Sequence, residues 1–160
     1  MVFMPLQPID RIDREILHHL QSNARLTNLE LAERVNLSAS PCLRRVKLLE
    51  ERGIIRRYAT LLDPRQVGLP ISVFVSVSLR SQDRQALIEF EHSVQGCPEV
   101  MECYLMTGTS DYLLRVVVPD LDAYETFLSA KLTNITSVAN IQSSFSLKQV
   151  VYRTELPIPG

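Results

Sequence analysis

Residues 27–57 read TNLELAERVNLSASPCLRRVKLLEERGIIRR, and this stretch decides the fold of the first part of the chain. Two short amphipathic segments lie on either side of Asn36-Leu37-Ser38. The second segment carries hydroxyl and basic side chains, namely Ser40, Arg44, Arg45 and Lys47, and it stops at Gly53. This layout is typical of a helix-turn-helix, in which the second helix enters the major groove of DNA.

Apolar periodicity predicts two short helices at the start of the chain. The first covers residues 10–20, with Asp10 as its N-cap. The second begins at Thr27, whose spacing to Glu30 fits a capping box. We expect Asn36 to close the turn, since asparagine tolerates the left-handed backbone better than most residues.

The third predicted helix begins near residue 38 or 40 and ends before Gly53, with Pro41 in its first turn, where a missing N–H costs little. Helical spacing places four apolar residues on one side, Cys42, Leu43, Val46 and Leu49. The opposite side holds Ser40, Arg44, Lys47 and Glu51, with Arg45 at the flank. We expect this polar side to face the DNA groove.

The second part of the chain follows another pattern. Residues 54–62 read as extended, and Asp63-Pro64 and Gly68-Leu69-Pro70 then mark a linker. The order β-α-β-β-α-β follows, which is typical of a ferredoxin-like fold with an antiparallel sheet and both helices on one face. The predicted strands are residues 71–79, 100–106, 112–118 and 138–152, with helices at 83–94 and from 120, and a turn at 107–111.

The fold class is therefore α+β, in two domains. We expect a helix-turn-helix domain with a linker strand at residues 1–62, a hinge at 63–70 and a ferredoxin-like domain at 71–160. Phe74 lies among serines on the strand face that the helices leave uncovered. A homodimer that packs sheet against sheet would bury that face.

The charge is small in total but uneven along the chain. A net charge of −1 at pH 7 by itself favours no polyanionic partner. Residues 1–62, however, hold ten lysines and arginines against seven acidic residues, and residues 63–160 hold seven against eleven. This division fits a nucleic-acid module joined to another domain, although short segments also differ by chance.

Cysteines and histidines indicate no metal site. Cys42, Cys97 and Cys103 form no C-x-x-C pair, and we expect all three to be buried apolar side chains in a reducing cytoplasm. His18, His19 and His92 lack the carboxylate or cysteine that would complete a ligand set, so no metal or cofactor is expected. No apolar run is long enough to span a membrane, and residues 1–8 lack a signal-peptide pattern.

Several segments in a fixed order resemble the Lrp/AsnC family of bacterial and archaeal transcription regulators. They are IDREIL (12–17), RLTN (25–28), ERV (33–35), LSASPCLRRV (37–46), GII (53–55), LLDP (61–64) and TGTSDYLL (107–114). The resemblance extends over nearly the whole chain, and its specificity lies in the order and spacing of the segments. One departure is Asn36, where relatives often have glycine.

The resemblance implies a winged helix-turn-helix, a linker strand and a βαββαβ module that dimerises and binds effectors. It also implies dimers that close into octamers, with small molecules, usually amino acids, held where dimers meet. We therefore expect a DNA-binding transcriptional regulator, not an enzyme, whose assembly or DNA affinity responds to an amino acid.

The candidate DNA contacts lie on the third predicted helix and around it. Arginine there can read guanine, but a solvated face with pairs such as Lys47–Glu51 is the alternative. Thr27 and Asn28 either hold a phosphate at a helix N-terminus or cap that helix. The expected contacts are Thr27, Asn28, Ser38, Ser40, Pro41, Arg44, Arg45 and Lys47, with Arg56 and Arg57 in the wing.

The candidate effector site is the turn around Gly108. Exposed backbone N–H groups there can bind an α-carboxylate, and Asp111 offers a carboxylate for an α-amino group. An ordinary hairpin loop is the alternative. The expected effector contacts are Met106, Thr107, Gly108, Thr109, Ser110, Asp111 and Tyr112, with Ser143 and Ser144 on the last strand.

Two other functions are alternatives to DNA-binding regulation. Ferredoxin-like dimers include small oxygenases, but the sequence shows no nucleophile–base pair, metal cluster or phosphate loop, and an enzyme leaves residues 27–57 unexplained. A pure amino-acid sensor that has lost DNA binding is the third reading. The retained basic residues Arg44, Arg45 and Lys47 count against it.

Overall fold

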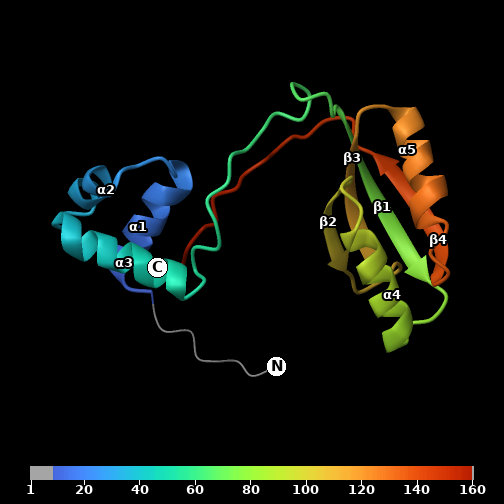
Figure 1. Cartoon of the computed structure of the whole chain (residues 1–160), viewed down its shortest axis with the longest axis horizontal. Coiled ribbons are helices and arrows are strands. Elements are labelled where there is room, and N and C mark those ends of the chain that lie inside the picture. The colour runs from blue at the N-terminus through green and yellow to red at the C-terminus, as the bar shows by residue number, and fades with distance from the viewer. Residues whose placement is uncertain (1–8, 160) are drawn as a thin grey trace. The chain divides into compact units, whose positions relative to one another are not determined.

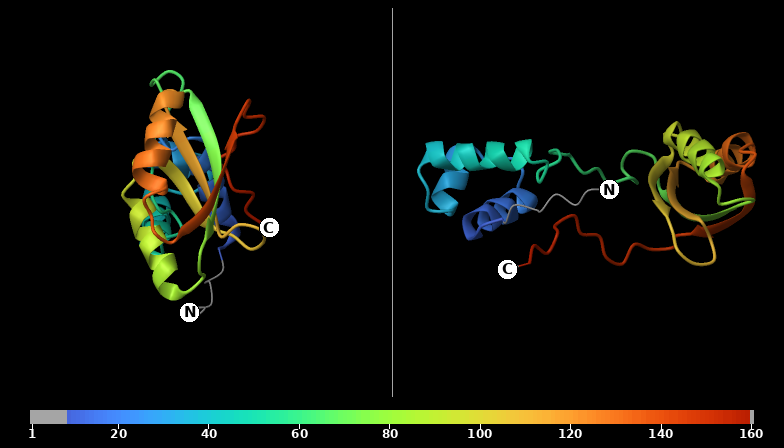
Figure 2. Two further views of the ribbon diagram at one scale, coloured as in Figure 1. Left: turned by 90° about the vertical axis from the view of Figure 1, so that its right-hand side faces the viewer. Right: turned by 90° about the horizontal axis from the view of Figure 1, so that it is seen from below.

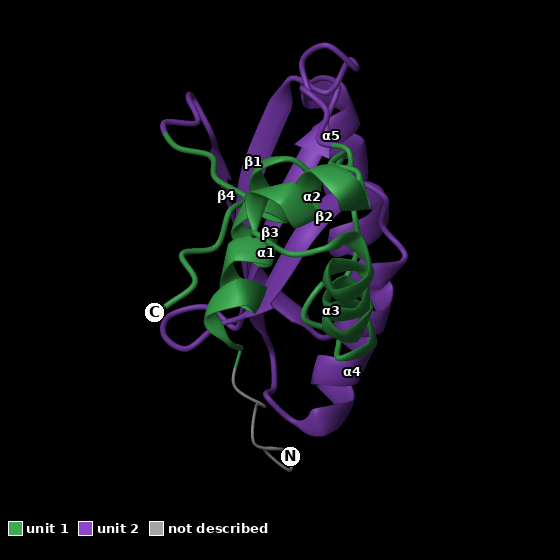
Figure 3. Cartoon of the chain, turned by 90° about the vertical axis from the view of Figure 1, so that its left-hand side faces the viewer, with its two compact units in different colours: residues 1–60, 151–160 green, residues 61–150 purple. Residues whose placement is uncertain are grey.

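The computed structural model describes residues 9–159, which form two compact units (Figure 1). The first unit comprises residues up to 60 together with the segment from residue 151, and the second comprises residues 61–150 (Figure 3). The first eight residues of the expected first domain lie outside the described part. The segment from residue 151, which we had assigned to the second domain, groups with the first unit instead.

The first unit contains the three expected helices, α1 Arg11–Ser22, α2 Asn28–Arg34 and α3 Ala39–Glu51. Asp10 caps α1 by accepting a hydrogen bond from the Asp13 N–H at 2.8 Å. Thr27 and Glu30 form both bonds of the predicted capping box at the start of α2. Asn36, with φ 53°, adopts the left-handed backbone that the turn between α2 and α3 requires.

Apolar side chains from all three helices form the core of this unit. Its buried members are Ile16, Leu17, Leu31, Ala32, Val35, Cys42 and Leu49. Leu43, which we had placed on the buried side of α3, is 43% exposed. It lies one residue, about 100° of helical rotation, from Cys42 and therefore points away from the line through Cys42 and Leu49.

The chain after α3 is extended, but it forms no strand. Within the described chain, residues 56–62 pair with no other segment, so the linker strand implied by the resemblance is not formed here. A strand exists only when a neighbour accepts and donates its backbone hydrogen bonds. Tyr58 instead ties this stretch to α3, since its hydroxyl donates to Glu50 Oε1 at 2.9 Å.

The second unit is the predicted ferredoxin-like sandwich. Its elements are β1 Ile71–Leu79, α4 Arg84–Gln95, β2 Val100–Leu105, β3 Tyr112–Val118, α5 Leu121–Phe127, the π-helical turn η1 Leu128–Leu132 and β4 Val138–Phe145. The strand order is β2-β3-β1-β4, and every neighbouring pair is antiparallel. β4 ends at Phe145, not at residue 152 as expected, because its register with β1 places Phe145 opposite Val73, near the first residue of β1.

The helices α4 and α5 cover one face of the sheet (Figure 2). Val73, Val75 and Val77 on that face are fully buried against Phe90 and Phe127. The opposite face carries Phe74, which is 40% exposed, and neither α4 nor α5 of the second unit covers it.

The cysteines are all free, and their burial differs. Cys42 is buried as predicted and Cys97 is half-buried, but Cys103 is exposed. The prediction for Cys103 was wrong because β2 is an edge strand of the sheet. An edge strand has a neighbour on only one side.

Candidate DNA interface and ligand-binding turn

The outer face of α3 presents a shallow groove. It is lined by Ser40, Leu43, Arg44, Lys47, Leu48 and Glu51. The predicted polar residues of this face are thus brought together, and all of them are exposed. Leu43 and Leu48 are additions that helical periodicity alone had not assigned to this face. Apolar side chains at such positions can contact thymine methyl groups, while arginine can read guanine.

Arg45 does not share this face. Its guanidinium donates to Asp10 Oδ2 at 2.7 Å and to Asp13 Oδ1 at 2.8 Å. These hydrogen bonds raise the pKa of Arg45. The pKa of Asp10 is lowered by the backbone N–H of Asp13 and, to a smaller extent, by Arg45. Arg45 therefore links α3 to α1, an arrangement that favours a supporting role over the direct DNA contact that we expected.

Thr27 and Asn28 support the turn between the helices. Thr27 forms the capping box, so its side chain is already used at the helix start. Asn28 Nδ2 donates to the Ala39 carbonyl at 2.8 Å and so links the first turn of α2 to the first turn of α3. Its Oδ1 is buried without a hydrogen-bond partner in the described structure. Both residues are thus better placed to set the angle of α3 than to contact DNA.

The remaining predicted DNA contacts border the groove. Ser38 is the N-cap of α3 and forms no side-chain cap, and Pro41 lies half-buried in the first turn. Arg56 and Arg57 are exposed just beyond the helix. They precede Tyr58, whose pKa burial and the hydrogen bond to Glu50 raise to about 12. Tyr58 therefore stays a neutral donor and anchors the two arginines near the end of α3.

The turn between β2 and β3 is closed by backbone hydrogen bonds. The Met106 N–H donates to the Asp111 carbonyl at 2.8 Å, and the Asp111 N–H donates to the Val77 carbonyl at 2.9 Å. Gly108 has φ 128°, a backbone conformation that side chains disfavour. Met106, Thr107 and Thr109 are exposed around it. Residues 106, 107 and 109 of the turn are therefore open to solvent, and the effector contact predicted there stays a prediction.

The carboxylate of Asp111 is already engaged within the chain. Its Oδ2 accepts the Leu79 N–H at 2.7 Å, and its Oδ1 accepts from Gln82 Nε2 at 2.6 Å. Asp111 thus joins the turn to the end of β1 and to the segment that precedes α4. A carboxylate has about four acceptor sites, so two hydrogen bonds leave capacity for an ammonium group.

Three other predicted effector contacts separate in the structure. Tyr112 is buried in the core, where its hydroxyl donates to Glu91 Oε1 at 2.8 Å and burial raises its pKa. Ser143 lies on the helix side of β4 and bonds the Tyr124 hydroxyl at 2.5 Å. Ser144 is exposed and pairs with Phe74, on the opposite face of the sheet. Tyr112 is therefore a core residue, because alternation along β3 places it with Leu114 and Val116 on the helix-covered face of the sheet.

Among residues 9–159, no cluster of histidine, cysteine or acidic residues could hold a metal ion. No described helix is both long and apolar enough to cross a membrane.

Comparison with known proteins places both units in one family. Residues 9–56 match a winged helix-turn-helix DNA-binding domain, and residues 72–156 match the Lrp/AsnC ligand binding domain. The chain is 47% identical to the Bkd operon transcriptional regulator of Pseudomonas aeruginosa, a match covering 94% of this chain and 98% of that one. It is 38% identical to the leucine-responsive regulatory protein of Escherichia coli K12, over 96% and 94% of the two chains.

Solved structures give the same result. A transcriptional regulator from Neisseria meningitidis in complex with L-Met aligns with a TM-score of 0.89 and 46% identity, covering 94% of this chain and 97% of that chain. An AsnC family regulator from Agrobacterium tumefaciens aligns with a TM-score of 0.87 and 44% identity, covering 92% and 96%. The chain belongs to the Lrp/AsnC family: it is a DNA-binding transcriptional regulator with a C-terminal ligand-binding domain.

Proposed function

We propose that this regulator binds paired DNA half-sites through α3 and that a small amino acid modulates its assembly or its DNA affinity. The observation that carries the proposal is the exposed basic groove on α3, held by a capped helix-turn-helix and joined to a ligand-binding unit. The L-Met complex of the Neisseria regulator supports an amino acid as the effector.

In the proposed complex, Arg44 reads a base edge and Lys47 with Ser40 contacts the backbone, while Leu43 and Leu48 meet apolar groups in the groove. Arg56 and Arg57 contact phosphates beyond the helix. Ser38 and Pro41, at the start of α3, contact the sugar-phosphate backbone of the DNA. Arg45, Asn28 and Thr27 act indirectly by fixing the orientation of α3.

The amino acid is proposed to bind at the turn of residues 106–111. Backbone N–H groups around Gly108 receive the α-carboxylate, and the free acceptor sites of Asp111 receive the ammonium group. Thr107, Thr109 and Ser110 provide neighbouring hydroxyls. Met106 is the exposed apolar side chain at the edge of the turn, where it can contact the side chain of the effector.

The assembly is proposed to begin with a dimer and to extend to an octamer. The uncovered sheet face with Phe74 is the surface that a second copy would bury. An effector held where dimers meet would then change the spacing of paired helix-turn-helix units. Free cysteines and a DNA target fit a cytoplasmic protein.

The DNA-binding part of the proposal is tested by fluorescence anisotropy with a duplex selected from random sequence, titrated between 50 and 200 mM salt. Because basic side chains that contact several phosphates release counterions, we expect the DNA affinity to fall by roughly 10³-fold or more across this salt range. A sensor that has lost DNA binding would show no anisotropy change even at the lowest salt. That result would reject DNA binding and leave the ligand-binding unit as the only active part.

A further inference from the structure

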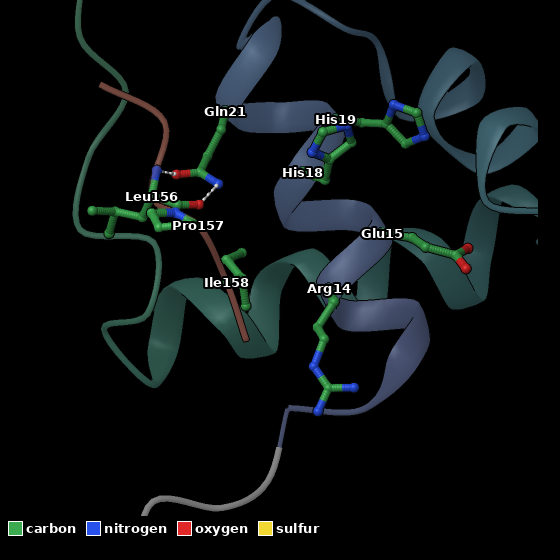
Figure 4. Close-up of a pocket in the computed structure, with 8 residues that line it drawn as sticks. All are labelled: Arg14, Glu15, His18, His19, Gln21, Leu156, Pro157 and Ile158. Atoms are coloured by element: carbon green, nitrogen blue, oxygen red, sulfur yellow. Dashed lines mark hydrogen bonds between the residues drawn. The ribbon is translucent and has the colours of Figure 1, made fainter. Parts of the chain in front are cut away.

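The segment after β4 returns to the DNA-binding unit. The side-chain amide of Gln21 on α1 forms two hydrogen bonds with the backbone of Leu156 (Figure 4). The Leu156 N–H donates to Gln21 Oε1 at 2.6 Å, and Gln21 Nε2 donates to the Leu156 carbonyl at 3.2 Å. One side chain thus satisfies both backbone groups of a residue that lies 135 positions further along the chain.

An apolar anchor accompanies these hydrogen bonds. Ile158 is half-buried and packs against the core of the first unit. Leu156, Pro157 and Ile158 line one side of a groove, and Arg14, Glu15, His18, His19 and Gln21 of α1 line the other. The contact therefore combines specific hydrogen bonds with apolar burial.

The local sequence prepares the segment for this contact. Leu156 precedes Pro157, and Ile158 precedes Pro159. A residue before proline is held in an extended conformation, and proline itself has a fixed φ. The alternation Leu-Pro-Ile-Pro thus presents the Leu156 backbone and the Ile158 side chain with little conformational entropy to lose.

Sequence and structure divide this region differently. The match to the ligand-binding domain runs to residue 156, yet residues 151–159 group with the DNA-binding unit. β4, which pairs with β1, ends only eleven positions before the Leu156 contact. The ligand-binding unit is therefore connected to the DNA-binding unit twice, once through residues 61–70 and once through the segment after β4.

We propose that residues 156–158 form a clasp on α1, through which the ligand-binding unit holds the helix-turn-helix unit and passes on the effect of its ligand. The docking itself is independent of the proposed function. The transmission of a ligand effect rests on that function.

Docking is tested by hydrogen exchange on the full chain, without DNA or ligand, in wild type, Gln21→Ala and Ile158→Ala. Alanine favours the helix at position 21, so loss of the hydrogen bonds does not weaken α1 itself. Leu147→Ala is the matched control, since Leu147 lies in the same segment and is 95% exposed. We expect exchange of the Leu156 amide to quicken about fivefold in both clasp variants and to stay unchanged in the control. Equal rates in wild type and Gln21→Ala would overturn the clasp.

Transmission is tested by measuring duplex affinity with and without L-methionine in wild type and in the Gln21→Ala/Ile158→Ala double variant. We expect the ratio of the two affinities to fall toward one in the double variant, while calorimetry shows the same L-methionine affinity. A full response in the double variant would overturn the transmission. Absence of a response in wild type would instead count against L-methionine as the effector, and hydrogen exchange would still decide the clasp.

Discussion

Two adjacent arginines on α3 are expected to have different roles, one in the stability of the first unit and one in DNA binding. Arg45 is bound to Asp10 and Asp13, whereas Arg44 lies exposed in the groove. Replacing each by methionine keeps the aliphatic part of the side chain and removes the charge. We expect that Arg45→Met lowers the stability of the first unit and that Arg44→Met lowers DNA affinity alone.

The size of the Arg45 effect follows from the burial of its partners. The Asp13 side chain is 12% exposed, so its carboxylate would remain poorly solvated without a cation, at a cost of about 2 kcal/mol. The Asp10 side chain is 51% exposed and would be rehydrated, so its contribution is at most about 1 kcal/mol. Arg45→Met should therefore lower the free energy of unfolding by roughly 2–3 kcal/mol.

The effect of Arg44→Met on the free energy of DNA binding should equal the contribution of one DNA contact. An exposed charge contributes about 0.5 kcal/mol or less to stability, so Arg44→Met should unfold as wild type does. Its loss from the groove should cost about 1–3 kcal/mol in specific binding.

Urea unfolding of the full chain and anisotropy with a selected duplex measure both variants. The free energy of unfolding comes from the transition of the first unit, and the affinity is compared at a temperature where both variants are folded. Unchanged stability in Arg45→Met together with unchanged affinity in Arg44→Met would refute the division of roles.

Three further predictions concern the supporting contacts. Asn28→Ala should lower the stability of the first unit by about 1 kcal/mol, because the Ala39 carbonyl loses its donor; lost DNA affinity at unchanged stability would instead make Asn28 a direct contact. Asp111→Asn should leave the second unit folded, since an amide oxygen can still accept the Leu79 N–H, but should weaken amino-acid binding about tenfold or more by calorimetry; normal binding would remove Asp111 from the site. The lowered pKa of Asp10 means that its contribution to stability is present above its ordinary pKa and is lost as the pH falls through the folded-state value. Asp10→Asn keeps an N-cap residue without a charge, so its urea midpoint should fall less between pH 5 and 3 than that of wild type, and identical curves would contradict this.

Much of the fold could be predicted because it rests on local chemistry. The capping box of Thr27 and Glu30, the left-handed turn at Asn36 and the alternation of β1 each depend on neighbours within a few residues. The strand order then follows from the order of elements, since the βαββαβ pattern fits few topologies.

The features that could not be predicted are contacts between distant parts of the chain. Periodicity gives the angle of Arg45 around its helix, but not that Asp10 and Asp13 lie within reach of it. Likewise, no local pattern shows that Asp111 meets Leu79 and Gln82, or that Leu156 docks on Gln21. Such contacts depend on which elements pack together in three dimensions. Patterns among neighbouring residues of a single sequence do not show this.

The end of β4 shows a related limit. Residues 146–152 include the apolar residues Leu147, Val150 and Val151, and the predicted strand runs through them to residue 152. A strand, however, ends where its neighbour ends, and β1 begins at Ile71. Composition predicts the tendency to form a strand, while the partner decides its length.

In the proposed mechanism, an amino acid bound to the second unit changes the DNA affinity of the first. The most direct measurement is duplex affinity by anisotropy, with and without each of the twenty amino acids at saturating concentration, with light scattering on the same samples. We expect a few amino acids to shift the affinity by about 5–150-fold, which corresponds to typical coupling between sites, and to change the assembly. The same affinity and the same particle mass with all twenty would contradict it.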